Sequence, residues 1–178
     1  MPQVTIRRIA DAGAVPLAGL ASLLIDAVDG GASVGFLGPL SPDEATAYWR
    51  ETAAAVGRHL HLWVAEDGEA VIGSVQIARC EKPNGRHRAE LQKLLVARSA
   101  RGRGVATRLM DAAEQYARSI GLRLLVLDTH AGSLAEAVYQ HRGWIKVGEV
   151  PEYAGLPSGD LIATAYYYLL LTPPPGPR

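Results

Sequence analysis

The segment 90–106, with the sequence ELQKLLVARSARGRGVA, constrains the fold of this chain more than any other. It predicts a strand, then a turn rich in Arg and Gly, then the start of a long helix. Apolar residues recur at helical spacing after the turn, and Gly121 follows as a C-terminal stop signal. The apolar positions are Val105, Leu109, Ala112, Ala113, Tyr116, Ala117 and Ile120.

The turn gathers the features that bind a phosphate or pyrophosphate group. Free backbone N–H groups and the positive end of the helix dipole meet the guanidinium groups of Arg101 and Arg103 there. Gly102 and Gly104 let the backbone approach an anion without an intervening Cβ. A basic turn that only caps a surface helix is the alternative interpretation.

Two other phosphate-binding motifs fit this turn less well. A dinucleotide-binding fingerprint needs a third Gly where Thr107 stands. A P-loop needs Gly-Lys followed by Ser or Thr, and that sequence occurs nowhere in the 178 residues.

The remaining patterns predict further strands and helices, with capping boxes at Ser41–Glu44 and Ser133–Glu136. Their order is β-α-α-β-β-β-α-β-α-β-β. The fold class is therefore α/β (α+β), with one mixed, mostly antiparallel twisted sheet of about seven strands flanked by four helices. We expect one domain over 1–172 and a disordered Pro-rich tail over 173–178. Strands are predicted at 4–9, 59–66, 71–79, 89–96, 124–127, 144–150 and 161–171, and helices at 15–28, 41–57, 105–120 and 133–142.

Bulk properties narrow the class of protein. Eighteen basic and eighteen acidic residues give a formal net charge of zero, which argues against a nucleic-acid partner. The single cysteine, Cys80, excludes an internal disulfide and fits a reducing compartment. No signal-peptide pattern opens the chain, and no apolar run approaches the ~20 residues of a membrane helix. We expect a cytoplasmic protein without a membrane partner, and the oligomeric state stays open.

Two motifs and the element order resemble the GCN5-related N-acetyltransferase (GNAT) family. Arg101-x-x-Gly104-x-Ala106 resembles its acetyl-CoA loop, and 135–144 resembles its A-x-x-x-Y-x-x-x-G-F segment. The resemblance implies the acyl-CoA N-acyltransferase fold over nearly the whole chain. Gly132 and Trp144 depart from the Asn and Phe common in the family, and the first change removes a side-chain contact to pantetheine.

Further segments are similar to those of the tabtoxin-resistance acetyltransferases within that family. This similarity implies acetylation of a β-lactam amino acid toxin such as tabtoxinine-β-lactam. Gly132 fits that narrower pattern. The segments are 30–36 (GGASVGF), 82–85 (KPNG), 88–94 (RAELQKL) and 127–129 (LDT).

The resemblance implies acetyl-CoA as co-substrate, no metal, and direct attack by an amine or hydroxyl in a ternary complex. Backbone groups of Leu94, Leu95 and Val96 would pair with pantetheine, and one N–H would polarise the thioester carbonyl. Their side chains would serve the core in either case. The other expected cofactor-binding residues are Arg101, Gly102, Arg103, Gly104, Val105, Ala106 and Ser133.

Three residues are candidate catalytic groups. The phenol of Tyr139, with an unperturbed pKa of about 10, can give a proton to the leaving thiolate. Glu90 on the strand before the loop and Asp128 at the end of strand 124–127 are candidate bases. The structural alternatives are a core Tyr, a solvated Glu and an Asp that caps a turn.

The loop between the first two helices covers the acceptor site in this family, so Ser33 and Phe36 are expected to contact substrate. The sequence 31–35 also matches G-x-S-x-G, which would suggest a Ser-His-Asp esterase using Asp128 and His130 or His141. That motif requires a strand before it, and here a helix precedes it. His59 and His61 have no third ligand at metal-binding spacing.

The sequence therefore predicts an N-acetyltransferase that moves the acetyl group of acetyl-CoA to a small polar acceptor. Two alternatives remain: an acetyltransferase for another small amine or amino acid, and a non-catalytic acyl-CoA sensor. Two acidic site residues favour a cationic or zwitterionic acceptor.

Overall fold

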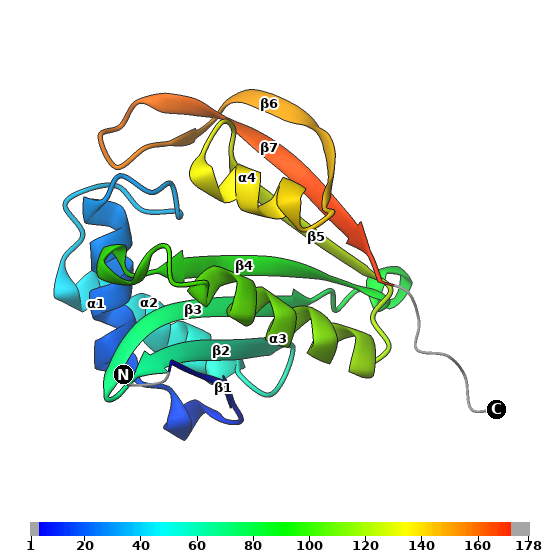
Figure 1. Ribbon diagram of the computed structural model, residues 1–178, viewed down its shortest axis with the longest axis horizontal. Helices are drawn as coiled ribbons and strands as arrows, with labels where there is room; N and C mark the ends of the chain where they lie inside the picture. The colour runs from blue at the N-terminus through cyan, green and yellow to red at the C-terminus, as the bar shows by residue number, and fades with distance from the viewer. Residues whose placement is uncertain (1–3, 172–178) are drawn as a thin grey trace.

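Residues 4–171 are described by a computed structural model, shown in Figure 1. The disorder predicted for 173–178 concerns residues outside that range. Seven strands form one sheet in the order β1-β2-β3-β4-β5-β7-β6. All neighbouring strands are antiparallel except β4 and β5, so the predicted mixed, mostly antiparallel sheet with four helices is confirmed. The strands are β1 Thr5–Ile9, β2 Leu60–Asp67, β3 Ala70–Arg79, β4 Arg88–Val96, β5 Leu124–His130, β6 Ile145–Gly155 and β7 Leu161–Leu170, and the helices are α1 Leu17–Asp29, α2 Pro42–Ala55, α3 Val105–Ser119 and α4 Leu134–His141.

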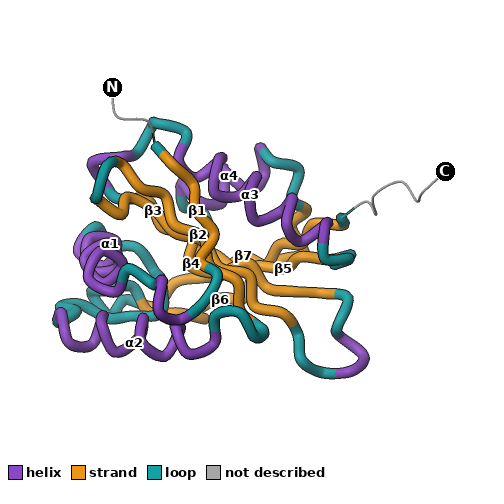
Figure 2. The backbone as a smooth tube through the Cα atoms, turned by 90° about the horizontal axis from the view of Figure 1, so that it is seen from below, coloured by secondary structure: helices purple, strands orange, loops and turns teal. Residues whose placement is uncertain are grey.

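The helices cover the two faces of the sheet in pairs. Figure 2 shows α3 and α4 on one side of the strands and α1 and α2 on the other. Each pair buries its own hydrophobic cluster, centred on Leu109 and Met110 on the α3/α4 face and on Leu24 and Trp49 on the α1/α2 face. Alternating residues of the strands supply one core or the other, because successive side chains of a strand point to opposite faces.

The helix starts follow local chemistry, with two differences from prediction. Ser41 forms the full predicted capping box with Glu44. At α4 only half of the box forms, since the Glu136 carboxylate accepts from the N–H of Gly132 rather than from that of Ser133. Helix α1 begins at Leu17, two residues later than predicted, because Pro16 disfavours helical geometry in the residue before it.

Two strands run further than their sequence patterns predict. β5 continues to His130, so Asp128 lies inside the strand rather than at its end. β6 continues through Pro151 to Gly155, with a register shift after Val150 and a positive φ of 51° at Glu152. An edge strand accommodates this proline because one of its sides has no ladder partner.

β4 and β5 pair over only three residues each. Arg88–Glu90 face Leu124–Val126 in parallel register, and beyond that point no pairing between the two strands occurs in residues 4–171. Figure 1 shows the two strands diverging from there. The sheet is therefore open between β4 and β5 beyond Glu90 and Val126, and the main candidate site residues lie there. Within residues 4–171, none of the helices has both the length and the apolar character needed to span a membrane.

Candidate functional site at the divergence of β4 and β5

The second half of β4 has an unpaired backbone edge. A strand directs N–H and C=O groups toward both neighbours. β3 pairs with β4 as far as Val96, whereas β5 leaves after Glu90. Leu95 packs in the α1/α2 core, while Leu94 and Val96 pack against the α3/α4 core. The side chains of all three residues therefore stabilise the fold, and their backbone on the β5 side remains available for a ligand.

The loop after β4 leads into an uncapped helix N-terminus. Gly102 and Gly104 have φ values of +74° and +73°, which favour glycine. Gly104 is the N-cap of α3, and no side chain accepts a hydrogen bond from the first turn. The N–H groups of Val105 and Ala106 therefore have no partner from a capping side chain. A Cβ added at either glycine would meet nothing within 4 Å, so the space beside the loop is open.

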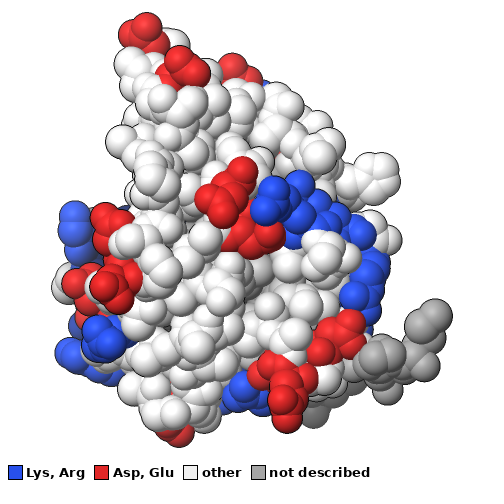
Figure 3. All heavy atoms as spheres, turned by 90° about the vertical axis from the view of Figure 1, so that its left-hand side faces the viewer, with Lys and Arg blue, Asp and Glu red and all other residues white. Residues whose placement is uncertain are grey.

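The arginines of this loop differ in whether a carboxylate pairs with them. Arg103 donates to Asp67 at 2.8 Å, and Arg98 pairs with Asp26 at 2.9 Å. Figure 3, which faces this side of the molecule, shows acidic side chains beside the basic ones. Arg101 is exposed and makes no ion pair within residues 4–171. Of the two arginines predicted to bind an anion, Arg101 therefore has no ion pair, although its charge helps to lower the pKa of Asp26, and Arg103 is held by a carboxylate.

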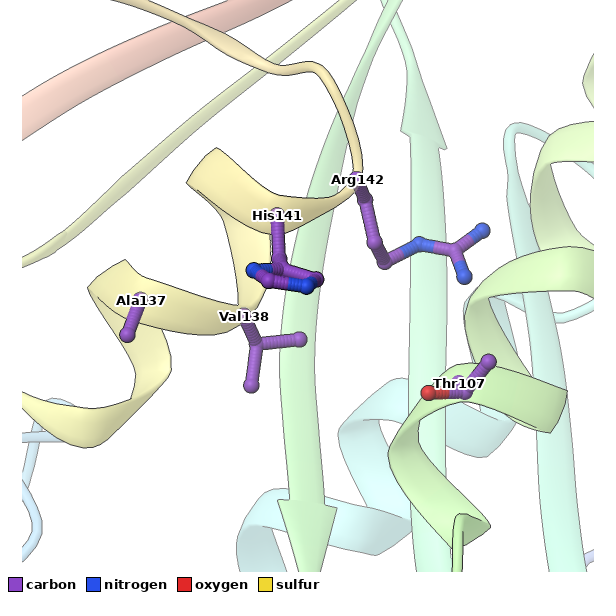
Figure 4. Close-up of a pocket in the computed structure, with 5 residues that line it drawn as sticks. All are labelled: Thr107, Ala137, Val138, His141 and Arg142. Atoms are coloured by element: carbon purple, nitrogen blue, oxygen red, sulfur yellow. The ribbon is translucent and has the colours of Figure 1, made fainter.

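A cavity of about 630 Å³ lies between the first turn of α3 and helix α4. Figure 4 shows Val138 and His141 extending from α4 on the side where Thr107 of α3 lies. Thr107 follows Gly104 by three residues, so the cavity borders the first turn of α3, next to its uncapped N-terminus. Its lining residues are Thr107, Ala137, Val138, His141 and Arg142.

Two buried carboxylates anchor α4 beside this cavity, and the sequence did not predict either of these networks. Glu114 on α3 pairs with Arg142 at 3.3 Å and accepts from the Trp144 indole. Glu136 accepts from the Lys146 ammonium at 2.6 Å, and also from Tyr167 and from the Gly132 amide. Hydrogen bonds from Lys146, Tyr167 and Gly132 lower the pKa of Glu136 to about 2. The capping box predicted at Ser133–Glu136 was the only sequence signal that involved Glu136.

Tyr139 lies on the α3/α4 side of the sheet. Its side chain is buried against Trp144 and Tyr167, with ring centroids 6.0 and 6.3 Å away. Burial, and then the negative charge of Asp128, raise its pKa far above the usual value. The phenol is therefore protonated at neutral pH, and Asp128 lies near enough to affect it. No other described residue hydrogen-bonds to its hydroxyl.

Glu90 and Asp128 lie together on the opposite face. Glu90 is in register with Val126, and Asp128 is in register with Tyr166. Residues in register share a face of the sheet, and Val126 and Asp128 are two residues apart on β5. The side chains of Glu90, Asp128 and Tyr166 therefore all lie on the α1/α2 face. A side-chain hydrogen bond with Tyr153, burial, and the nearby charges, Asp128 and Glu90 among them, raise the pKa of Tyr166 to about 12. We call Glu90, Asp128, Tyr153 and Tyr166 the carboxylate–tyrosine cluster.

The two tyrosines of this cluster are functional candidates that the sequence analysis missed. Their rings meet edge to face at 5.7 Å. Tyr166 could have been found by its alternation along β7, since it stands opposite Asp128 once the strand order is known. Tyr153 had no signal, because the predicted strand ended at Val150.

The α1–α2 loop covers this face together with the β6–β7 hairpin. The Ser33 hydroxyl donates weakly to the Gly155 carbonyl at 3.5 Å, and the Gly38 N–H donates to Pro157 at 2.9 Å. Phe36 packs edge-on against Tyr48 of α2 at 5.3 Å. The loop follows helix α1, so the strand–turn–helix setting of a hydrolase nucleophile is absent.

Two further sequence candidates, Ser133 and His61, make contacts that stabilise the fold. Ser133 caps α4 by accepting from the Glu136 N–H at 3.3 Å. His61 is buried against the Tyr116 ring at 4.8 Å. Across residues 4–171, no three His, Cys, Asp or Glu side chains are grouped so as to hold a metal ion.

The known proteins that this chain resembles in sequence are N-acetyltransferases. The family model described as "Acetyltransferase (GNAT) family" matches residues 19–144. An uncharacterized N-acetyltransferase from the hisH–hisA intergenic region of Azospirillum brasilense is 32% identical over 130 residues, covering 72% of this chain and 76% of that protein. N-acetyltransferase 8B of Rattus norvegicus is 37% identical over 90 residues, covering 49% of this chain. The chain matches only 40% of the length of that rat protein.

Solved structures share the fold at low sequence identity. An N-acetyltransferase from Staphylococcus aureus Mu50 superposes with a TM-score of 0.79 at 23% identity, covering 96% of this chain and 99% of that one. The acetyltransferase yncA from Salmonella typhimurium, whose structure contains acetyl-CoA, has a TM-score of 0.76 at 19% identity, with 98% of each chain covered.

Proposed function

Because the chain belongs to the GNAT family of acetyltransferases, we propose that it transfers an acetyl group from acetyl-CoA to an amine or hydroxyl of a small polar acceptor. The divergence of β4 and β5 carries this proposal. On one side of the sheet it adjoins an uncapped helix N-terminus and a protonated tyrosine. On the other side it adjoins two carboxylates.

The residues on the α3/α4 side fit acetyl-CoA. The pyrophosphate would lie at the loop 101–106, where the N–H groups of Val105 and Ala106 have no capping side chain and Arg101 makes no ion pair within residues 4–171. The pantetheine arm would add along the open edge of β4 at 94–96. Acetyl-CoA supplies the activated acyl thioester when it is bound.

The chain's own groups then divide the proton transfers between the two faces. Glu90 and Asp128 favour binding of an ammonium acceptor, and the two carboxylates take up the two protons that its nitrogen loses as it becomes an amide. A backbone N–H on the open edge of β4 stabilises negative charge on the carbonyl oxygen of the acyl group. The Tyr139 hydroxyl holds a proton for the departing sulfur, because its raised pKa keeps it protonated.

The acceptor lies on the α1/α2 face in this proposal. The cluster offers two carboxylates and two phenols, and the α1–α2 loop brings Ser33 and Phe36 over the same face. A cationic or zwitterionic acceptor matches this chemistry. A β-lactam amino acid toxin such as tabtoxinine-β-lactam is one candidate acceptor. If it is the acceptor, the reaction serves to detoxify it.

Release of free CoA thiol from acetyl-CoA tests the proposal directly. The acceptor panel contains β-lactam amino acids, other amino acids, polyamines and aminoglycosides. Turnover with one class supports acetyl transfer and names the acceptor. Tight acetyl-CoA binding by calorimetry without any turnover supports a non-catalytic sensor, and absence of binding contradicts the assignment of the loop 101–106.

A further inference from the structure

Lys93 occupies an unusual backbone position on β4. Gln92 is in register with Gln76 and Leu95 with Ser74, so two residues of β4 face one residue of β3. Lys93 has a positive φ of 49°, which is uncommon for a non-glycine residue. Such a bulge redirects side chains and is frequent beside active sites. The Ser74 hydroxyl supports it by donating to the Lys93 carbonyl at 3.0 Å.

The bulge places the Lys93 ammonium on the acceptor face. Without it, alternation from Gln92 would direct Lys93 toward α3. Instead its Nζ lies 5.4 Å from the centroid of the Tyr48 ring on α2. A Cβ added at Gly35 would lie 3.8 Å from the same Nζ, so the α1–α2 loop is adjacent. The ammonium therefore lies between α2 and the loop that carries Ser33 and Phe36.

No carboxylate within residues 4–171 pairs with Lys93. Tyr48 provides a cation–π contact, and no ion pair to its ammonium occurs in that range. The residue is only partly exposed. A ligand that carries a negative charge would supply the counter-ion that this partly buried ammonium lacks.

The spacing along β4 suits a small zwitterion. Glu90 and Lys93 are three residues apart, which in a regular strand puts their Cα atoms about 10 Å apart, and the bulge at Lys93 shortens this. An α-amino acid carries its ammonium and carboxylate on one carbon, and charge-assisted hydrogen bonds of about 2.8 Å at each end give it a similar reach.

We propose that Lys93 binds the carboxylate of an α-amino acid acceptor whose amino group lies at Glu90 and Asp128. This inference rests on the proposed acetyl transfer and narrows its acceptor class. A polyamine is disfavoured, because it would bring a second cation toward the Lys93 ammonium. Lys93 is thus a specificity-determining residue.

The test compares α-amino acids with their own α-amides, which keep the amine and lack the negative charge. The readout is the ratio of kcat/KM for acid and amide in each pair, from CoA thiol release. We expect at least one pair with a ratio of about 10 or more, equivalent to about 1.4 kcal/mol, because the amide has no negative charge to pair with the Lys93 ammonium. Lys93→Met should bring that ratio close to one, mainly by raising KM for the acid.

Two further variants control the result. Lys93→Arg keeps the charge and should keep most of the preference. Lys82→Met makes the same change at an exposed lysine outside the site and should behave as the wild type. An unchanged ratio in Lys93→Met overturns the proposal, as does a wild type that never prefers the acid.

Failure of this proposal can be distinguished from failure of acetyl transfer. Turnover of amines that lack a carboxylate, without turnover of amino acids, overturns the role of Lys93 and supports acetyl transfer. Acetyl-CoA binding without turnover of any acceptor overturns both. Circular dichroism and acetyl-CoA affinity verify that each variant is folded.

Discussion

The two sides of the sheet are assembled from the chain in different ways. On the α3/α4 side, the open edge of β4, the glycine loop and the start of α3 are consecutive in sequence, within 94–107. On the α1/α2 side, the carboxylate–tyrosine cluster takes one residue from each of β4, β5, β6 and β7. A local motif therefore identifies the first side, whereas only the strand order assembles the second.

The largest effect should come from removing both carboxylates on the acceptor side. In the double variant Glu90→Gln/Asp128→Asn, kcat should fall about 10³-fold, because general base catalysis is lost. The acetyl-CoA dissociation constant should stay within about twofold of wild type, since the amides keep the shape of both side chains. Steady-state kinetics and calorimetry measure the two quantities. A loss of acetyl-CoA affinity as large as the loss of kcat would break the separation of the two sides.

Tyr139→Phe should have the next largest effect. Loss of the acid should lower kcat about 10²-fold. Stability should change little, because no other described residue hydrogen-bonds to the hydroxyl. Tyr116→Phe on α3 is a matched control away from the site, and its kcat should equal that of wild type. A Tyr139→Phe enzyme with full kcat would remove Tyr139 from the mechanism.

Glu136→Gln should affect stability rather than acceptor selection. Three donors lose their charged partner, and we expect a loss of about 2 kcal/mol in the free energy of unfolding. The folded-state pKa of about 2 lies below the usual 4.5, so this stabilisation is present above pH 4.5 and is lost as the pH falls toward 2. Urea denaturation at pH 7 and pH 3 should show the difference from wild type shrinking at the lower pH. An equal difference at both values would contradict the assigned ionisation.

The smallest effect separates the two loop arginines. Arg101→Ala should raise the acetyl-CoA dissociation constant about fivefold, equivalent to about 1 kcal/mol, and less so at high salt. Arg103→Ala should raise it less, because that guanidinium pairs with Asp67 at 2.8 Å. Calorimetry at two salt concentrations compares them. A larger effect at Arg103 would mean that its ion pair opens when the ligand binds.

The sequence predicted the fold well because its signals are local. Helical periodicity, the Ser41 capping box and the glycine stops need only neighbouring residues. The errors in the predicted strand ends arise because a local signal does not show which strands pair. Pro151 marks a break in isolation, yet β6 is an edge strand and continues to Gly155.

The acceptor side could be predicted only in part. Glu90 and Asp128 were proposed as bases, but placing Tyr166 beside them requires the strand order, and placing Tyr153 there requires the full length of β6. The orientation of Lys93 depends on a bulge that strand alternation does not reveal. The Glu136 network similarly requires β6 and β7 to lie beside α4.

Amide hydrogen exchange with and without acetyl-CoA tests the central claim, that cofactor and acceptor occupy opposite sides of the open sheet. Peptides covering 92–108 and 133–142 should gain protection when acetyl-CoA binds, because backbone groups there would contact it. Peptides covering 31–40 and 150–160 should change only when an acceptor is added. Protection confined to the α1–α2 loop, or none over 92–108, would contradict the account.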